Sequence, residues 1–327
     1  MNKITKIIWF ASFVIVHFSR SQTITQNFGT GTNSFSIDFV QIGNPGNAAD
    51  TTGYGSVGYD YKIGKYEITN LQYTKFLNSV AKNSDPYGLY NVFMDTGHMY
   101  SPNAIIRSGT SGNFIYTTTT GFENKPVMFV SWFDAARYAN WLNNGAQNGG
   151  NTENGAYSLN GTTSALNIQR NSNSLFWLPS ENEWFKSAYF DPLKNGNGGY
   201  WNYPTKSDSI NDTQANYDSG LLKDVDYGAS SVYGTFGQGG NLWEWNGSDV
   251  TGLRPDGSAL PSGAKGLRGG SAGTTADALL RDYREGASPD FEWADTTFRI
   301  AGVPEPSALS LLVVGLGGLA ILRRRRS

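Results

Sequence analysis

The chain has 327 residues, enough for one large or two ordinary domains. Its net charge of −2 and pI of about 5.7 give no electrostatic footprint for nucleic acid, so no nucleic-acid partner is expected. The complete absence of cysteine excludes disulfides, thiolate metal sites and thiol nucleophiles, and two histidines are too few for a three-histidine metal centre. Abundant glycine and aromatic residues with few charges favour a loop-rich fold with aromatic packing.

The N-terminal segment, residues 1–21, has the layout of a secretory signal peptide. Lysines come first, an apolar run from Ile7 to Val16 follows, and the small residues Ser19 and Ser21 suit cleavage. The alternative is an uncleaved anchor, although the apolar run is short for a membrane span. We therefore expect an exported protein.

One domain is expected between the two ends, over residues 22–302, because no charge run or proline-rich linker divides it. Its first part, residues 22–54, is an N-terminal strand region. There, the alternating run of residues 35–40 predicts a strand.

Three short amphipathic helices are predicted from their first residues. Each begins with a capping box, in which Thr69, Ser131 or Ser180 is followed three positions later by Gln, Asp or Glu. Apolar stripes follow at helical spacing, so each helix is expected to lie against a core. A ligand-binding role for these stripes is the minority interpretation.

Two polar segments rich in glycine and asparagine, residues 82–125 and 143–174, read as insertions. Long surface loops can carry binding function, but solvated decoration is the favoured interpretation. His98 lies in the first insertion and is expected to be a surface residue.

The stretch GGNLWEWN, residues 239–246, places a carboxylate between two indoles. In an extended segment Glu244 shares a face with Leu242 and Asn246, while the two tryptophans fill the other face. A buried carboxylate needs a partner, which can be an arginine such as Arg268, a set of backbone N–H groups or a bound cation.

Charged residues gather near the end of this region. They could line a groove for an anionic or sugar ligand, or form ion pairs and backbone clamps that hold a coil-rich fold together, and the second interpretation is favoured. The residues are Arg268, Arg281, Arg284 and Arg299, with Asp277, Asp282, Glu285 and Asp290.

The C-terminal segment, residues 303–327, begins with Pro304-Glu305-Pro306, continues with an apolar run from Ala308 to Leu322 and ends with four arginines. A hydrophobic segment followed by basic residues halts in a membrane. The segment resembles the PEP-CTERM sorting signal of Gram-negative bacteria. This resemblance implies export to the cell envelope or beyond, transient membrane anchoring, and an exosortase-type processing enzyme as a partner that removes the tail.

Six motifs in order resemble the formylglycine-generating enzyme, or sulfatase-modifying factor, family over residues 55–302. They are YKIGKYEITNLQYTKFLN (61–78), NKPVMFVSWFDAARYANWLN (124–143), FWLPSENEWFKSAYFDP (176–192), YGTFGQGGNLWEWN (233–246), LRGGSAG (267–273) and TTFRIAG (296–302). The resemblance implies an α+β, C-type lectin-like domain with little regular structure, short antiparallel strands and a few short amphipathic helices.

The family's calcium sites imply two sets of ligands here. Glu244 with the carbonyls of Gly240 and Leu242 would form one set, and Asn216, the Tyr217 carbonyl and Asp218 would form the other; oxygen ligands of this kind suit Ca²⁺. At the position of a further family ligand, an Asn or Asp, this chain has Gly237, so the first site could instead be empty.

The chain departs from the family in its chemistry. The resemblance places the two catalytic cysteines near Thr274 and Leu279, neither of which can form a thiolate or bind copper. Formylglycine generation is therefore excluded and no copper site is expected. Thr297 also replaces a family glycine, which puts that turn in doubt.

Two functions remain open. The first is a non-catalytic binding or structural module whose aromatic-rich loops contact a glycan, the extracellular matrix or a protein. The alternative is a divergent, metal-dependent enzyme that acts without cysteine. A closed site at Thr274 and Leu279 favours the first, and a pocket of converging His, Asp or Glu side chains favours the second. The sequence does not give the oligomeric state.

Overall fold

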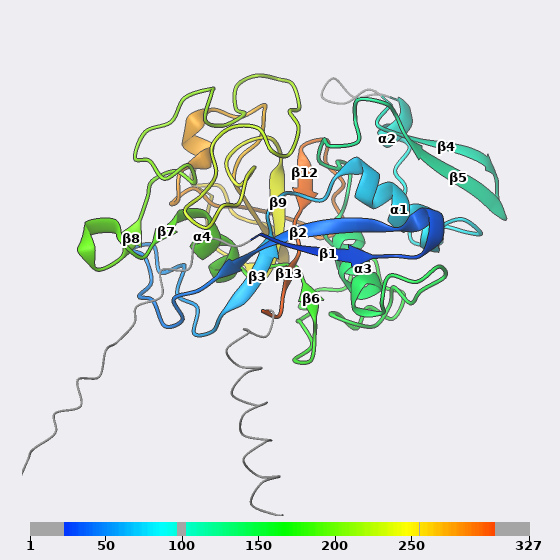
Figure 1. Cartoon of the computed structure of the whole chain (residues 1–327), viewed down its shortest axis with the longest axis horizontal. Helices are drawn as coiled ribbons and strands as arrows, with labels where there is room; N and C mark the ends of the chain where they lie inside the picture. The colour runs from blue at the N-terminus through cyan, green and yellow to red at the C-terminus, as the bar shows by residue number, and fades with distance from the viewer. Residues whose placement is uncertain (1–22, 97–102, 255, 305–327) are drawn as a thin grey trace, which may run out of the picture.

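The computed structural model describes residues 23–96, 103–254 and 256–304 (Figure 1). The predicted signal peptide, His98 and the apolar part of the predicted sorting signal lie outside these residues. Within the described ranges, no helix is both long and apolar enough to cross a membrane.

The first sheet joins the two ends of the domain. Its strand order is β1-β2-β3-β13-β6, and every neighbouring pair is antiparallel. The predicted strand at residues 35–40 is confirmed and is slightly longer, as β2. The bounds are β1 Thr23–Phe28, β2 Phe35–Ile42, β3 Tyr61–Gly64, β6 Phe176–Trp177 and β13 Ala301–Gly302.

The second sheet carries the second half of the GGNLWEWN stretch, residues 243–246, which begins β9. Its order is β11-β10-β9-β12; β10 is antiparallel to both of its neighbours, whereas β12 runs parallel to β9. The bounds are β9 Trp243–Val250, β10 Ala264–Arg268, β11 Glu285–Ala287 and β12 Thr296–Phe298.

All three predicted helices are confirmed, each with both hydrogen bonds of its capping box. Their apolar stripes are buried in the main hydrophobic core, as expected for amphipathic helices on a sheet scaffold. The bounds are α1 Asn70–Val80, α3 Trp132–Asn143 and α4 Glu181–Tyr189.

The segment 82–125 is more ordered than its composition suggests. It forms α2, Phe93–Thr96, and a β-hairpin of β4, Ile105–Thr110, and β5, Asn113–Thr118, which packs against α1 and projects beside α2 in Figure 1. The segment 144–174 has no helix or strand, but it buries Tyr157 and Leu159 in the core.

The remaining regular structure consists of short pieces, one between β1 and β2 and the others after α4 and β10. They are the hairpin β7, Phe190–Asp191, with β8, Gly199–Tyr200, and the 3₁₀ turns η1, Gly31–Asn33, η2, Lys194–Gly196, and η3, Ala276–Leu279. The predicted α+β class, with few helices and short, mostly antiparallel strands, is confirmed.

Candidate functional site

The segment after β10 brings Thr274 and Leu279 to the same place. Gly269 and Gly270 both have positive φ, which turns the chain sharply after Arg268. A β-carbon added to Gly270 would lie 2.7 Å from Leu279 Cδ1 and 3.0 Å from Thr274 Oγ1. The two positions therefore lie around a single glycine, as the family resemblance implies.

This place is filled by the chain itself. Leu279 is fully buried, and its carbonyl accepts a hydrogen bond of 3.1 Å from the Tyr189 hydroxyl. The Thr274 hydroxyl accepts from the Ser271 N–H at 2.9 Å and donates to the Ser271 carbonyl at 3.0 Å. An apolar side chain and a hydroxyl engaged in its own turn offer no nucleophile or metal ligand at this point.

The partner of Glu244 is Arg299, not Arg268. Glu244 and Arg299 are both fully buried, with Arg299 Nε 2.5 Å from Oε2 and Nη2 2.6 Å from Oε1. Trp184 donates its indole N–H to Oε2 at 2.8 Å. The remaining guanidinium donors reach the carbonyls of Gly64 and Phe236, so this buried pair is bidentate and well satisfied.

Glu244 does not fit a calcium ligand in this geometry. Both of its oxygens already accept hydrogen bonds, and a Ca²⁺ at either one would lie beside the buried positive charge of Arg299. Gly240 has φ of 81° and donates its N–H to the Gly269 carbonyl, while Leu242 is buried in the core. The ion pair therefore supplies the compensation that a cation would otherwise provide.

The second predicted ligand set lies beside the first. Asn216 forms a parallel bridge with Gly240, and its carbonyl accepts a 2.7 Å bond from the Asn241 N–H. The Asn216 side chain is buried and engaged with Ser219, Leu221 and Asn241, whereas Asp218 is exposed. Tyr217 is half-buried between them.

The side-chain oxygens of Glu244 and Asn216, one from each set, accept hydrogen bonds from other residues of the chain. In the ranges that the structure describes, no three His, Cys, Asp or Glu side chains come together to hold a metal ion.

Glu67 is a buried carboxyl that sequence reasoning missed. It is 1% exposed; Oε1 accepts a 3.3 Å bond from the Asn241 amide, and Oε2 has no hydrogen-bond partner. Burial, and then the charge of Glu244, raise the pKa of Glu67 well above its usual value. Both influences favour the neutral form of Glu67, and no local motif in the sequence marks this residue.

The arginines near the C-terminus act as clamps, but their partners are not the acids nearby in sequence. Arg268 and Arg284 both bind Glu181 of α4, at 2.7 Å and 2.9 Å, and Arg281 binds Asp50 at 2.8 Å. Glu285 pairs instead with Arg254, and Asp290 accepts from Ser288. Ion pairs to remote acids explain why a coil-rich region holds a defined shape.

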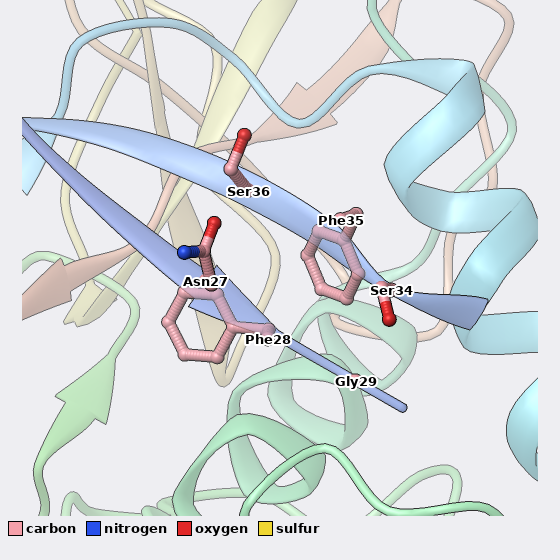
Figure 2. A pocket seen from close by; sticks show the side chains of 6 residues that line it. All are labelled: Asn27, Phe28, Gly29, Ser34, Phe35 and Ser36. Atoms are coloured by element: carbon pink, nitrogen blue, oxygen red, sulfur yellow. The ribbon is translucent and has the colours of Figure 1, made fainter. Parts of the chain in front are cut away.

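A separate hollow of about 490 Å³ lies at the turn between β1 and β2 (Figure 2). The Phe28 and Phe35 rings lie side by side there, with centroids 5.6 Å apart. The polar lining side chains are those of Asn27, Ser34 and Ser36. Since the lining has no carboxylate, imidazole or cation, it offers no acid–base or metal chemistry.

A comparison with models of known protein families shows to which family the chain belongs. Residues 44–303 match the model of the sulfatase-modifying factor enzyme 1-like domain. The chain belongs to the sulfatase-modifying factor family. A search of curated protein sequences finds no match.

One solved structure supports the fold of this sulfatase-modifying factor domain, and two others show weaker similarity. Variable protein 1 of Treponema denticola superposes with a TM-score of 0.55 at 18% identity, covering 86% of this chain and 99% of the other. CarF gives 0.49 at 19% identity, covering 82% and 99%. PvdO from Pseudomonas aeruginosa gives 0.45 at 15% identity, covering 85% and 98%. The predicted C-type lectin-like variant of the fold is confirmed, and at these identities the likeness concerns the fold alone.

Two departures from the family pattern have local structural explanations. A β-carbon on Gly237 would lie 2.3 Å from Glu67 Oε2, so the Glu67 carboxyl takes the space beside this glycine. Gly237 also has φ of 71°, which favours glycine. Thr297 lies in β12 opposite Glu244, where the chain forms a strand and no turn is needed.

Proposed function

We propose that this sulfatase-modifying factor domain is a non-catalytic binding module. The observation that carries the proposal is the place of Leu279, fully buried against Gly270 where the family resemblance puts a catalytic cysteine. A buried leucine and a threonine closed in its own turn leave no reacting group at this point. What the fold offers instead is a rigid framework whose loops can contact a glycan or a protein.

The first test separates binding from turnover. The purified chain is incubated with a sulfatase-derived cysteine peptide, with and without added copper or iron, and the products are followed by mass spectrometry. The expected result is an unchanged peptide under all conditions. Conversion of the cysteine to an aldehyde, or any metal-dependent turnover, would overturn the proposal in favour of a divergent enzyme.

The second test looks for the ligand. Labelled protein is applied to a glycan array and, in parallel, to immobilised extracellular proteins, with heat-unfolded protein as the control. Saturable binding of the folded chain is expected on one of the two. Absence of binding on both would count against a binding module.

We also propose that the protein is exported and processed at both ends. The proposal rests on the sequence layout of residues 1–21 and 303–327, with an exosortase-type enzyme acting on the second segment. Mass spectrometry of the mature protein should find an N-terminus near residue 22 and a C-terminus near Pro304. An intact chain in the cytoplasmic fraction would contradict export.

A further inference from the structure

Residues 91–93 and 291–293, which are far apart in sequence, are held side by side at the surface. The Asn91 amide donates a short hydrogen bond to Glu292 Oε2. The Phe93 ring packs on Phe129 with centroids 5.6 Å apart, and the Phe129 N–H donates to the Trp293 carbonyl at 3.1 Å. One direct hydrogen bond and a connection through Phe129 therefore join the two segments.

These segments expose apolar side chains that together form what we call the aromatic surface: Val92, Phe93, Phe291 and Trp293. Their exposed fractions are 52%, 53%, 45% and 37%, and the Phe291 and Trp293 rings lie 5.2 Å apart. The other markedly exposed aromatic residues in the described ranges, Tyr59 and Tyr227, each use their hydroxyl in an internal hydrogen bond. A contiguous exposed apolar surface is typical of a binding site.

The segments that form the aromatic surface carry acids and no cation of their own, although Arg137 of α3 stacks on Tyr87 at 4.0 Å. Residues 85–96 and 288–295 contain no lysine or arginine, and their five acids are Asp85, Asp95, Asp290, Glu292 and Asp295. Arg107, on the strand β4 that packs near α2, stacks on Tyr90 and Phe114.

A bound cation would also relieve an existing cost. Burial, and then the charge of Asp85, raise the pKa of Glu292, while the Asn91 amide partly offsets them. A positive group beside Glu292 would stabilise its ionised form. The electrostatics therefore favour a cationic ligand and disfavour an anionic polymer.

We propose that the aromatic surface binds a polymer of amino sugars with free ammonium groups. The sugar rings stack on Phe291 and Trp293, and the ammonium groups interact with Asp290, Glu292 and the aromatic faces. This inference rests on the proposed binding function and names its site and ligand class. A lysine-rich protein segment shares the charge but has no ring to stack, so it serves as the competing outcome.

The test uses the full chain and isothermal titration calorimetry at low salt with four probes: a glucosamine oligosaccharide, its fully N-acetylated counterpart, a neutral glucan oligosaccharide and oligolysine. The glucosamine oligosaccharide is expected to bind about fivefold or more tightly than any other probe. Phe291→Ala, Trp293→Ala and Asp290→Asn should each weaken this binding by about fivefold with an unchanged melting temperature. Leu253→Ala, at a more exposed apolar position outside these segments, is the control and should bind as the native chain does.

Each other result counts against the proposal in a different way. If the acetylated sugar binds as tightly as the glucosamine oligosaccharide, charge does not contribute to binding. If oligolysine binds as tightly, the sugar ring does not contribute. If Trp293→Ala lowers the melting temperature, weaker binding by this variant does not test the site. Trp293→Phe and Asp290→Asn then provide the test, because both keep the local packing. No binding of glucosamine oligosaccharide overturns this site, whereas a signal elsewhere on the glycan array would leave the binding module intact.

Discussion

The centre of the domain and its aromatic surface place polar groups in opposite ways. Around Glu244 and Arg299, the ionic groups are fully buried and meet one another. Around Phe291 and Glu292, rings are exposed, and the segments that carry them contain acids but no lysine or arginine. A site whose charges are already paired stabilises the fold, whereas a site with exposed rings and uncompensated charge has free energy to gain from a ligand.

The largest expected effect comes from breaking the central pair. Arg299→Met removes the guanidinium and leaves Glu244 buried without its counter-charge, so unfolding should become easier by about 3–5 kcal/mol. Urea denaturation measures the change. Lys125→Met breaks a more exposed pair with Asp224 and, as the control, should cost less than about 1 kcal/mol. Equal effects of the two substitutions would show that burial does not decide the cost.

The next effect concerns the space shared by Gly237 and Glu67. Gly237→Ala adds a β-carbon against Glu67 Oε2 at a positive φ, and should destabilise the fold by about 1–3 kcal/mol. Glu67→Ala removes the obstructing carboxyl, so the double variant should lose less than the sum of the single losses. Denaturation of the native chain, the two single variants and the double variant measures this coupling. Strictly additive losses of stability would show that the two residues do not interact.

A smaller effect depends on pH. Because the pKa of Glu67 is raised in the folded protein, the folded state holds a proton that the unfolded chain releases above about pH 4.5. Stability contributed by this group is therefore present at low pH and is lost as pH rises toward the folded pKa. A glutamine cannot ionise, so the Glu67→Gln variant should gain stability relative to the native chain as pH rises above about 4.5. If the curves of unfolding free energy against pH are parallel for the native chain and Glu67→Gln, the raised pKa of Glu67 is contradicted.

The smallest expected effect is that of calcium. Since Arg299 already neutralises Glu244, removing metal with a chelator should leave the melting temperature unchanged, and Glu244→Gln should not alter calcium uptake. Calorimetric titration of metal-stripped protein provides the check. Saturable calcium binding that is lost in Glu244→Gln would reverse this assignment, while binding lost only in Asp218→Asn would place the ion at the second predicted set.

Local features were predictable from the sequence because their causes are local. The capping boxes at Thr69, Ser131 and Ser180 satisfy N–H groups within one turn, so a few letters predict where each helix begins. The strand at residues 35–40 follows in the same way from alternating side chains. The fold class came from six motifs of the family, which were matched in order.

Partners across the fold were not predictable, because spacing in sequence says nothing about them. Arg268 has acids a few positions away but binds Glu181, which is 87 residues distant. Glu67 contacts Gly237 because of how the loops pack, and no local sequence pattern predicts that these two residues are neighbours. The β4–β5 hairpin was not predictable for a related reason: its exposed face carries Ile106 and Ile115, so apolar and polar residues do not alternate as they do in a half-buried strand.

The strand β13 has a consequence for how the protein is made. It pairs with β3 on one side and with β6 on the other, and it follows β12, which completes the other sheet. Both sheets are therefore complete only when residues 296–302 have left the ribosome. The nascent domain cannot close progressively from its N-terminus, and its final folding step must follow synthesis of β13.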